Sequence, residues 1–335
     1  MILTYKIKHG RDFSSELLKA RKVAEFALEH GPSSSSSVKH LGLKSAISNQ
    51  ILRKYGRDKK IKKVSRVNLI VPGQGVKSDT QTSILTIPCL KLSLRYQFFG
   101  FSSINQVELN CEYAFISVTV PENIPIHPTA WLGIDLNATG HCVVVADPST
   151  GKVLKLGKKA PHVHAKYKNQ RKNFQKKQKF RLVKKIKNRE SRIVRDLNHK
   201  ISRKVVDYAV KNNTGIVLED LKDVRKTKKQ AKSFRYALHS WSFSQLRNFI
   251  EYKAKLKGVP IVKIDPAYTS QQCSRCGLLG VRNGKEFKCP YCGHVDHADV
   301  NASFVISMRY QGMCQLPVVR DIGKGNTDIP VGATI

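Results

Sequence analysis

Two Cys-x-x-Cys pairs constrain this chain more than any other feature. They are Cys273 with Cys276 and Cys289 with Cys292, and twelve residues separate them. Each turn aims two thiolates at one ion, and two such turns together form a closed tetrahedral zinc site without an open coordination position. We therefore expect a structural zinc ribbon over residues 268–295 that binds one Zn²⁺. The other four cysteines lie far apart in the sequence and are expected to be ordinary thiols.

The charge of the chain indicates a polyanionic partner. Lys and Arg number 60 against 24 Asp and Glu, which gives a formal net charge of +36 over 335 residues. The basic residues are spread along the chain and are not gathered on one amphipathic anchor, so nucleic acid is a better partner than a membrane. No run approaches the roughly 18 apolar residues of a bilayer span, and the start lacks the features of a signal peptide. We expect a cytoplasmic protein.

The order of periodic segments predicts two domains and a loose end. Residues 1–129 read as a small β-domain with a helical insert at about 14–62, in which the serine run 33–37 is expected to be a flexible loop. Alternating residues at 90–97 and at 106–113 predict strands. Residues 130–310 follow the order three strands, helices, strand, helix, strand, helix, which is the order of an RNase H-like α/β domain. Residues 311–335 lack periodicity and are expected to be a flexible tail.

Three acidic residues stand in places where a lone carboxylate is costly. Asp135 lies within an apolar strand and Glu219 ends another, where burial costs several kcal/mol unless a cation faces the group. Asp299 opens the last helix, and an N-cap is its simplest interpretation. In an RNase H-like order all three converge, and such carboxylates bind Mg²⁺, with two ions in a two-metal hydrolytic site. The competing acids are Asp296, which is the most serious, and Asp220, Asp223 and Asp265.

Two basic stretches are candidate nucleic-acid contacts. Twelve of the 24 residues from 166 to 189 are Lys or Arg and none is acidic, a density that would repel itself without a charged partner. The second stretch begins near residue 222. Such contacts confer affinity and salt sensitivity but no sequence choice. The candidates are Lys166, Lys168, Arg171, Lys172, Lys176, Lys177, Lys179, Arg181, Lys184, Lys185, Arg225, Lys226, Lys228 and Lys229.

Four motifs in order resemble the TnpB family of insertion-sequence proteins. They are Gly-Ile-Asp-Leu-Asn, Val-Leu-Glu-Asp-Leu, Asp-Pro-Ala-Tyr-Thr-Ser-Gln-Gln-Cys-Ser-x-Cys-Gly and Asp-Val-Asn-Ala-Ser, all within residues 131–310. The chain is also similar to the compact type V CRISPR effectors, which share a RuvC-like nuclease. The first 130 residues resemble the family's wedge β-domain with recognition helices by pattern alone.

The resemblance implies an RNA-guided DNA endonuclease of a prokaryotic cell. A guide RNA would pair with the target strand of double-stranded DNA, and one RuvC-like site would cut it. Asp135, Glu219 and Asp299 take the places of the family's catalytic residues. Two alternatives stay open: a noncatalytic RNA-guided repressor, against which the intact acids speak, and a transposase or recombinase. Assembly of two copies on one RNA also stays open.

Overall fold

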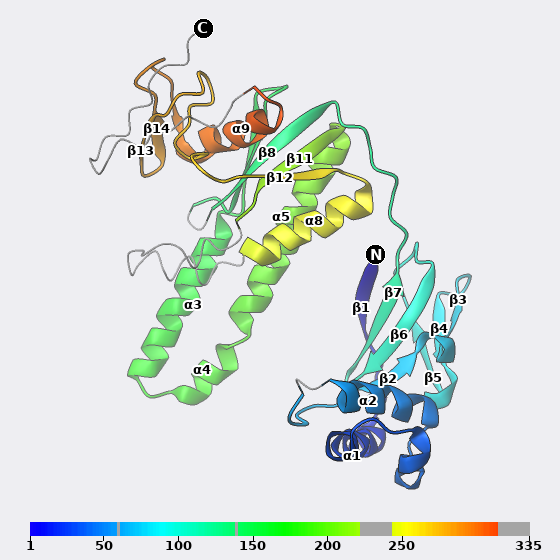
Figure 1. The fold of residues 1–335 in the computed structure, drawn as a ribbon. Helices are drawn as coiled ribbons and strands as arrows, with labels where there is room; N and C mark the ends of the chain where they lie inside the picture. The colour runs from blue at the N-terminus through cyan, green and yellow to red at the C-terminus, as the bar shows by residue number, and fades with distance from the viewer. Residues whose placement is uncertain (59–60, 138–139, 222–242, 314–335) are drawn as a thin grey trace. The chain divides into compact units, whose positions relative to one another are not determined.

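The computed structural model describes residues 1–58, 61–137, 140–221 and 243–313. The basic candidates Arg225, Lys226, Lys228 and Lys229 and the tail from residue 314 lie outside these ranges. The chain forms two compact units, Met1–Glu122 and Asn123–Ile335, which are described separately (Figure 1). In the described parts of the chain, no helix is long and apolar enough to cross a bilayer.

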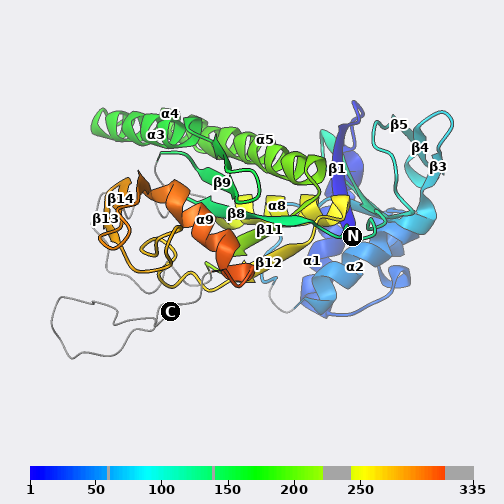
Figure 2. The same ribbon diagram turned by 90° about the horizontal axis from the view of Figure 1, so that it is seen from above.

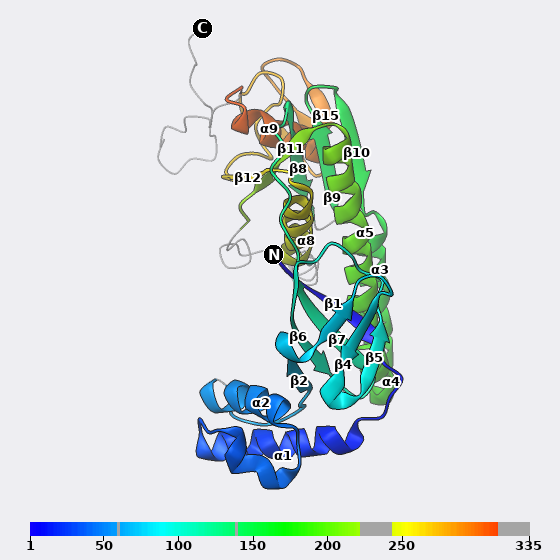
Figure 3. The ribbon, with the colours of Figure 1, turned by 90° about the vertical axis from the view of Figure 1, so that its right-hand side faces the viewer.

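The first unit contains two small antiparallel sheets and two α-helices. Alternating buried residues of the strands and the inner faces of α1 and α2 form one apolar core. The two helices lie side by side next to β2 (Figure 3). The first sheet has the order β1 (Ile2–Lys8), β7 (Tyr113–Thr119), β6 (Ser103–Leu109), β2 (Leu69–Pro72), and the second β3 (Lys77–Asp79), β4 (Ile84–Ile87), β5 (Leu92–Arg95). The helices are α1 (Ser14–His30), α2 (Ser45–Arg57) and the 3₁₀ turns η1 (Ser35–Leu41), η2 (Gly73–Gly75) and η3 (Pro88–Leu90).

Two local expectations for this unit were wrong. The serine run enters the 3₁₀ helix η1, where Val38 packs into the core, and is not a simple loop. The alternation over 106–113 is not one strand, because the chain turns between β6 and β7. Asn110 makes this turn: its side-chain oxygen accepts hydrogen bonds from the backbone N–H of Glu112 (2.8 Å) and Tyr113 (2.7 Å).

The second unit is built on a mixed five-stranded sheet of order β10-β9-β8-β11-β12. The strands are β8 (Ala130–Leu136), β9 (Val143–Asp147), β10 (Lys152–Leu156), β11 (Thr214–Glu219) and β12 (Ile261–Ile264). The three strands that were expected first form an antiparallel meander, β8 to β10, and β11 runs parallel to both β8 and β12. The helices are α3 (Lys159–Lys176), α4 (Phe180–Ile186), α5 (Arg189–Lys211), α8 (Phe243–Lys257) and α9 (Ala298–Tyr310).

Helices cover both faces of this sheet, and the two faces differ in character. Leu132 and Ile134 of β8 point toward α5 and α8 and belong to the apolar core with them. The alternate residue Gly133 faces α9, which packs on the opposite side (Figure 2). A Cβ atom at Gly133 would lie 1.8 Å from the Ser303 carbonyl oxygen, so helix and strand touch backbone to backbone. Asp135 points to the same side as Gly133.

The cysteine-rich segment forms a third, small sheet next to α9. Its strands β13 (Val281–Asn283), β14 (Glu286–Lys288) and β15 (Val295–His297) are antiparallel. Its buried cluster is small, consisting of Phe287 with Cys273, Cys289 and Ala298. A core of this size is insufficient for independent folding, so a bound metal ion is expected to stabilise the ribbon.

Candidate carboxylate site and cysteine ribbon

The four cysteines of the ribbon converge on one point. Their sulfur atoms all lie within 4.8 Å of one another, with 3.7 Å between Cys273 and Cys292 and 3.5 Å between Cys276 and Cys289. Four thiolates at about 2.3 Å from a tetrahedral zinc ion are about 3.8 Å apart, so this geometry fits zinc. The predicted ligand set is thus brought together, and its closed shell of four sulfurs indicates a structural site.

The sheet places the two strand acids next to each other. β11 runs parallel to β8 with Val217 opposite Gly133, so Glu219, two residues further on, lies beside Asp135 on the face that α9 covers. Each acid has a neutral donor. Asn137 donates its amide to Asp135 at 2.8 Å, and the Thr269 hydroxyl donates to Glu219. The acids therefore share one edge of the sheet, where β8 and β11 end.

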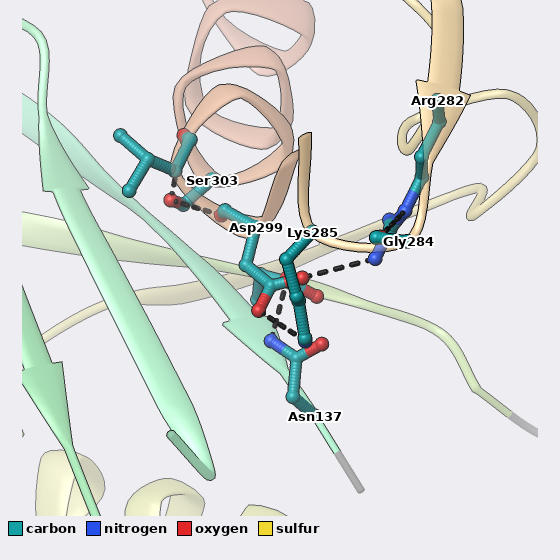
Figure 4. Close-up of polar contacts among 8 residues, drawn as sticks. Asn137, Arg282, Gly284, Lys285, Asp299 and Ser303 are labelled. Carbon is teal, nitrogen blue, oxygen red and sulfur yellow. Dashed lines mark hydrogen bonds and ion pairs between the residues drawn. The ribbon is translucent and has the colours of Figure 1, made fainter. Parts of the chain in front are cut away.

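Asp299 reaches this edge from α9. It lies in the first turn of the helix, one residue after Ala298, and is 1% exposed. The alternative interpretation of Asp299 as an N-cap is wrong, because His297 occupies that position. Two cations from the β13–β14 hairpin bind its two oxygens: Arg282 at 3.0 Å and Lys285 at 2.5 Å (Figure 4). A cation thus faces the acids, as the cost of burying carboxylates requires.

Burial and mutual repulsion raise the pKa of both strand acids. Burial, with the charge of Asp299 as a second cause, raises the pKa of Asp135 to about 6. Burial and the charge of Asp135 raise the pKa of Glu219 to about 8. These electrostatic causes link all three acids into one cluster. Raised pKa values in a cluster of buried carboxylates are typical of sites that need further positive charge.

The three acids are spread more widely than the ligands of one compact metal site. Within the described residues, the four cysteines are the one group of three or more His, Cys, Asp or Glu side chains whose ligand atoms all lie within 4.8 Å of one another. Acids that share two ions about 3.5–4 Å apart need not be so tightly grouped. Carboxylate oxygens are the ligands that Mg²⁺ prefers. Asp135, Glu219 and Asp299 could therefore hold Mg²⁺ ions.

The competing acids are engaged elsewhere. Asp296 lies in β15, where it accepts a hydrogen bond from the His297 N–H at 2.6 Å. Asp220 is 3.7 Å from Arg247, and Asp265 accepts from the Ala267 N–H at 2.9 Å. Asp223 lies outside the described residues.

Three polar residues that join the ribbon to α9 were missed by the sequence reasoning. Asn301 is fully buried, donates to the Gln272 carbonyl at 2.7 Å and accepts from the Ser274 N–H at 2.9 Å. Gln272 also accepts from Arg309 at 2.8 Å. The available signal was the position of Gln272 and Asn301 inside the quoted motifs, whereas Arg309 lies outside all of them. These bonds fix the first knuckle against the helix that carries Asp299.

The described basic candidates lie on α3, α4 and the segment between them. Most are exposed, but Arg171 is half-buried and pairs with Glu190 at the start of α5. His164 binds the same carboxylate at 2.7 Å. Glu190 therefore ties α3 to α5, and the exposed cations are carried on a braced helical hairpin. The exposed set is Lys166, Lys168, Lys172, Lys176, Lys177, Lys179, Arg181, Lys184 and Lys185.

Together these features define an α/β protein in which a four-cysteine ribbon is joined to a buried carboxylate site. A family model described as Cas12f1-like, TNB domain, matches residues 243–306, which include α8, the ribbon and most of α9.

Two curated relatives and one solved structure extend this match. TnpB-like protein MJ0751 of Methanocaldococcus jannaschii is 33% identical over 210 residues, which cover 58% of this chain and 75% of that protein. CRISPR-associated endodeoxyribonuclease Cas12f1 of Sulfoacidibacillus thermotolerans is 42% identical over 110 residues, 32% of this chain but only 25% of that protein. A cryo-EM structure of the Cas12f1–sgRNA–target DNA complex has a similar fold, with a TM-score of 0.60 at 17% identity, covering 88% of this chain and 82% of that one. The chain belongs to the TnpB family.

Proposed function

We propose that this protein is an RNA-guided DNA endonuclease encoded by an insertion sequence. Its guide RNA would pair with one strand of double-stranded target DNA, and the carboxylate site would hydrolyse phosphodiester bonds. The convergence of Asp135, Glu219 and Asp299 at one buried edge of the sheet carries this proposal. The strand order, with a meander followed by two parallel strands, supports an RNase H-like, RuvC-like nuclease domain.

Relatives support the choice of substrate. One relative is named an endodeoxyribonuclease, and the structure with the similar fold is a complex with sgRNA and target DNA. The formal charge of +36 and the exposed cations of α3 and α4 suit two polyanions. On this interpretation the helical hairpin contacts phosphates, and the choice of sequence comes from base pairing with the guide.

In this scheme the three acids would hold the metal ions, and neighbouring polar residues would hold the acids in place. Bound magnesium ions, two in this scheme, would activate the attacking water and stabilise the leaving 3′ oxygen. Asp135, Glu219 and Asp299 would supply the carboxylate ligands, with Asn137 and Thr269 orienting two of them. Arg282 lies within reach of the same site, because it binds Asp299. Zinc would stabilise the ribbon through its ligands Cys273, Cys276, Cys289 and Cys292. The ribbon would in turn hold the β13–β14 hairpin in place against α9.

A cleavage assay with isosteric variants tests the proposal. Protein purified with its own RNA should cut matching plasmid DNA with Mg²⁺ and not with EDTA, and sequencing that RNA identifies the guide. Asp135→Asn should lower the cleavage rate on the order of 10³-fold while DNA binding in a gel-shift assay is retained. Asp296→Asn is the matched control and should cut normally, because Asp296 lies outside the carboxylate site.

Two results would redirect the assignment. Guide-dependent binding without cleavage by the unmodified chain would favour the noncatalytic repressor. Joining of DNA ends without any RNA would favour a recombinase. Full cleavage by Asp135→Asn would remove Asp135 from the site.

A further inference from the structure

The tip of the β13–β14 hairpin is fixed against the N-terminus of α9. Gly284 and Lys285 form a two-residue turn, with Gly284 at φ +58° in the first position, which a type II′ turn requires. The Lys285 carbonyl accepts a hydrogen bond from the Ala298 N–H at 2.8 Å. The backbone of Lys285 is therefore held in place, whereas its side chain of four methylenes can still change position.

That side chain ends on the carboxylate of Asp299. Its ammonium lies 2.5 Å from Oδ2, and Arg282 lies 3.0 Å from Oδ1, so both oxygens of Asp299 are already bound (Figure 4). A divalent cation that uses Asp299 as a ligand needs one of these oxygens. Each oxygen keeps a second lone pair that can accept the ion, but the ion would then lie beside an ammonium or a guanidinium. Repulsion between these like charges favours the departure of one of the two cations.

Lys285 is the cation better suited to leave. Its side chain is 38% exposed, against 27% for Arg282. Arg282 is tied to its own hairpin, because its Nε donates to the Gly284 carbonyl at 3.2 Å. An ammonium is a compact, strongly hydrated point charge on a flexible stem, whereas a guanidinium has a rigid set of donors. Water can thus receive the lysine head group without disturbing the hairpin.

The charge balance favours the exchange. When Asp135, Glu219 and Asp299 are all ionised they carry three negative charges, and Arg282 with Lys285 supplies two positive ones. Replacing Lys285 by one divalent cation brings the positive charge to three. One divalent cation therefore reduces the repulsion among the three acids more than Lys285 does.

We propose that Lys285 is an internal counter-cation that holds Asp299 when the carboxylate site lacks a divalent ion and is displaced when one binds. The inference rests on the proposed function, because it concerns the same acids. It assigns to the ribbon a part in setting metal affinity in addition to its structural part. In the metal-free protein, the charge of Lys285 offsets part of the cost of burying the acids. Because Lys285 competes with the metal ion for Asp299, it also weakens metal binding.

Metal titration and thermal melting of the full chain test this exchange. Lys285→Met removes the charge and keeps a long apolar side chain, and Lys288→Met is the matched control on the exposed face of β14. Mn²⁺ serves as the probe, and free Mn²⁺ is measured by electron paramagnetic resonance. Only the binding that Asp135→Asn abolishes is counted, which removes contributions from RNA and the ribbon.

Opposite effects with and without metal are expected. Lys285→Met should bind Mn²⁺ on the order of 10-fold more tightly than the unmodified chain. The variant should melt at a lower temperature in buffer without added Mn²⁺, and this deficit should disappear when Mn²⁺ is saturating. Lys288→Met should change neither quantity.

The outcomes separate the two proposals. Unchanged or weaker Mn²⁺ binding by Lys285→Met would overturn the exchange, since the lysine would then be a permanent part of the site. Complete absence of Mn²⁺ binding that depends on Asp135 would instead overturn the metal site of the proposed function.

Discussion

Gly133→Ala should separate the two halves of the carboxylate site. The added Cβ would lie 1.8 Å from the Ser303 carbonyl oxygen and 2.7 Å from the Ser307 nitrogen, and both atoms belong to the backbone of α9. Neither can rotate away. Ordinary contact begins at 3.4 Å, so strand and helix must separate by about 1.6 Å, which displaces Asp299 from Asp135.

The cost follows from two contributions. Overpacking of this kind destabilises by about 1–3 kcal/mol. The separation also strains the hydrogen bond that the Ser307 hydroxyl donates to the Trp131 carbonyl at 2.7 Å, worth roughly 0.5–1.5 kcal/mol. A total of about 1.5–4.5 kcal/mol should lower the melting temperature on the order of 10 °C for a unit of this size. A displacement above about 1 Å in a catalytic group should lower the cleavage rate by about 10²-fold or more.

The assay compares single-turnover cleavage with calorimetric melting. Val205→Ala is the stability-matched control, because Val205 is fully buried between α5 and the opposite face of the sheet. It should lose about 2 kcal/mol of stability and keep its cleavage rate well below the melting temperature. Normal cleavage by Gly133→Ala under those conditions would refute the idea that this close approach positions the site.

Two further predictions concern the acids and the ribbon. Without added divalent ions, the free energy of unfolding of the unmodified chain should fall as the pH rises from about 5 to 8. Folding raises the pKa of Glu219 from 4.5 to about 8, so over this range the folded state holds a proton that the unfolded state lacks. Urea unfolding of Glu219→Gln should show a smaller fall in the free energy of unfolding over this pH range. An equal fall would contradict the raised pKa of Glu219. Metal analysis should find about one zinc per chain, and Cys289→Ser should lose that zinc and melt at a lower temperature, because the small buried cluster around Phe287 depends on the ion. A folded ribbon without metal would remove the zinc assignment.

Local patterns were sufficient for much of the architecture. The spacing of the four cysteines identified a ligand set that the structure brings within 4.8 Å, since the Cys-x-x-Cys turn depends only on neighbouring residues. Apolar runs separated by turn residues predicted the three strands that form the meander of β8, β9 and β10. The pattern was misleading over 106–113, where an asparagine turn interrupts an alternation that continues through it.

The acids stand out in the sequence because burying a carboxylate within an apolar strand is energetically costly. The costly positions of Asp135 and Glu219 are visible in the sequence, and the parallel register of β11 with β8 makes them neighbours. For Asp299 the sequence left an N-cap open. The start of α9 at Ala298 and the cations from the hairpin decide against it.

The sequence by itself determined the four cysteines that come together, the order of strands and helices, and the acids that are poorly placed as isolated charges. Only the tertiary structure brought Arg282 and Lys285 to Asp299, Thr269 to Glu219 and Asn301 to the first knuckle. Lys285 is one of 60 basic residues, and nothing in its neighbours along the chain distinguishes it. Periodicity reports which face of an element is buried, whereas the partner of a polar side chain depends on how separate elements pack, and that packing is a property of the whole unit.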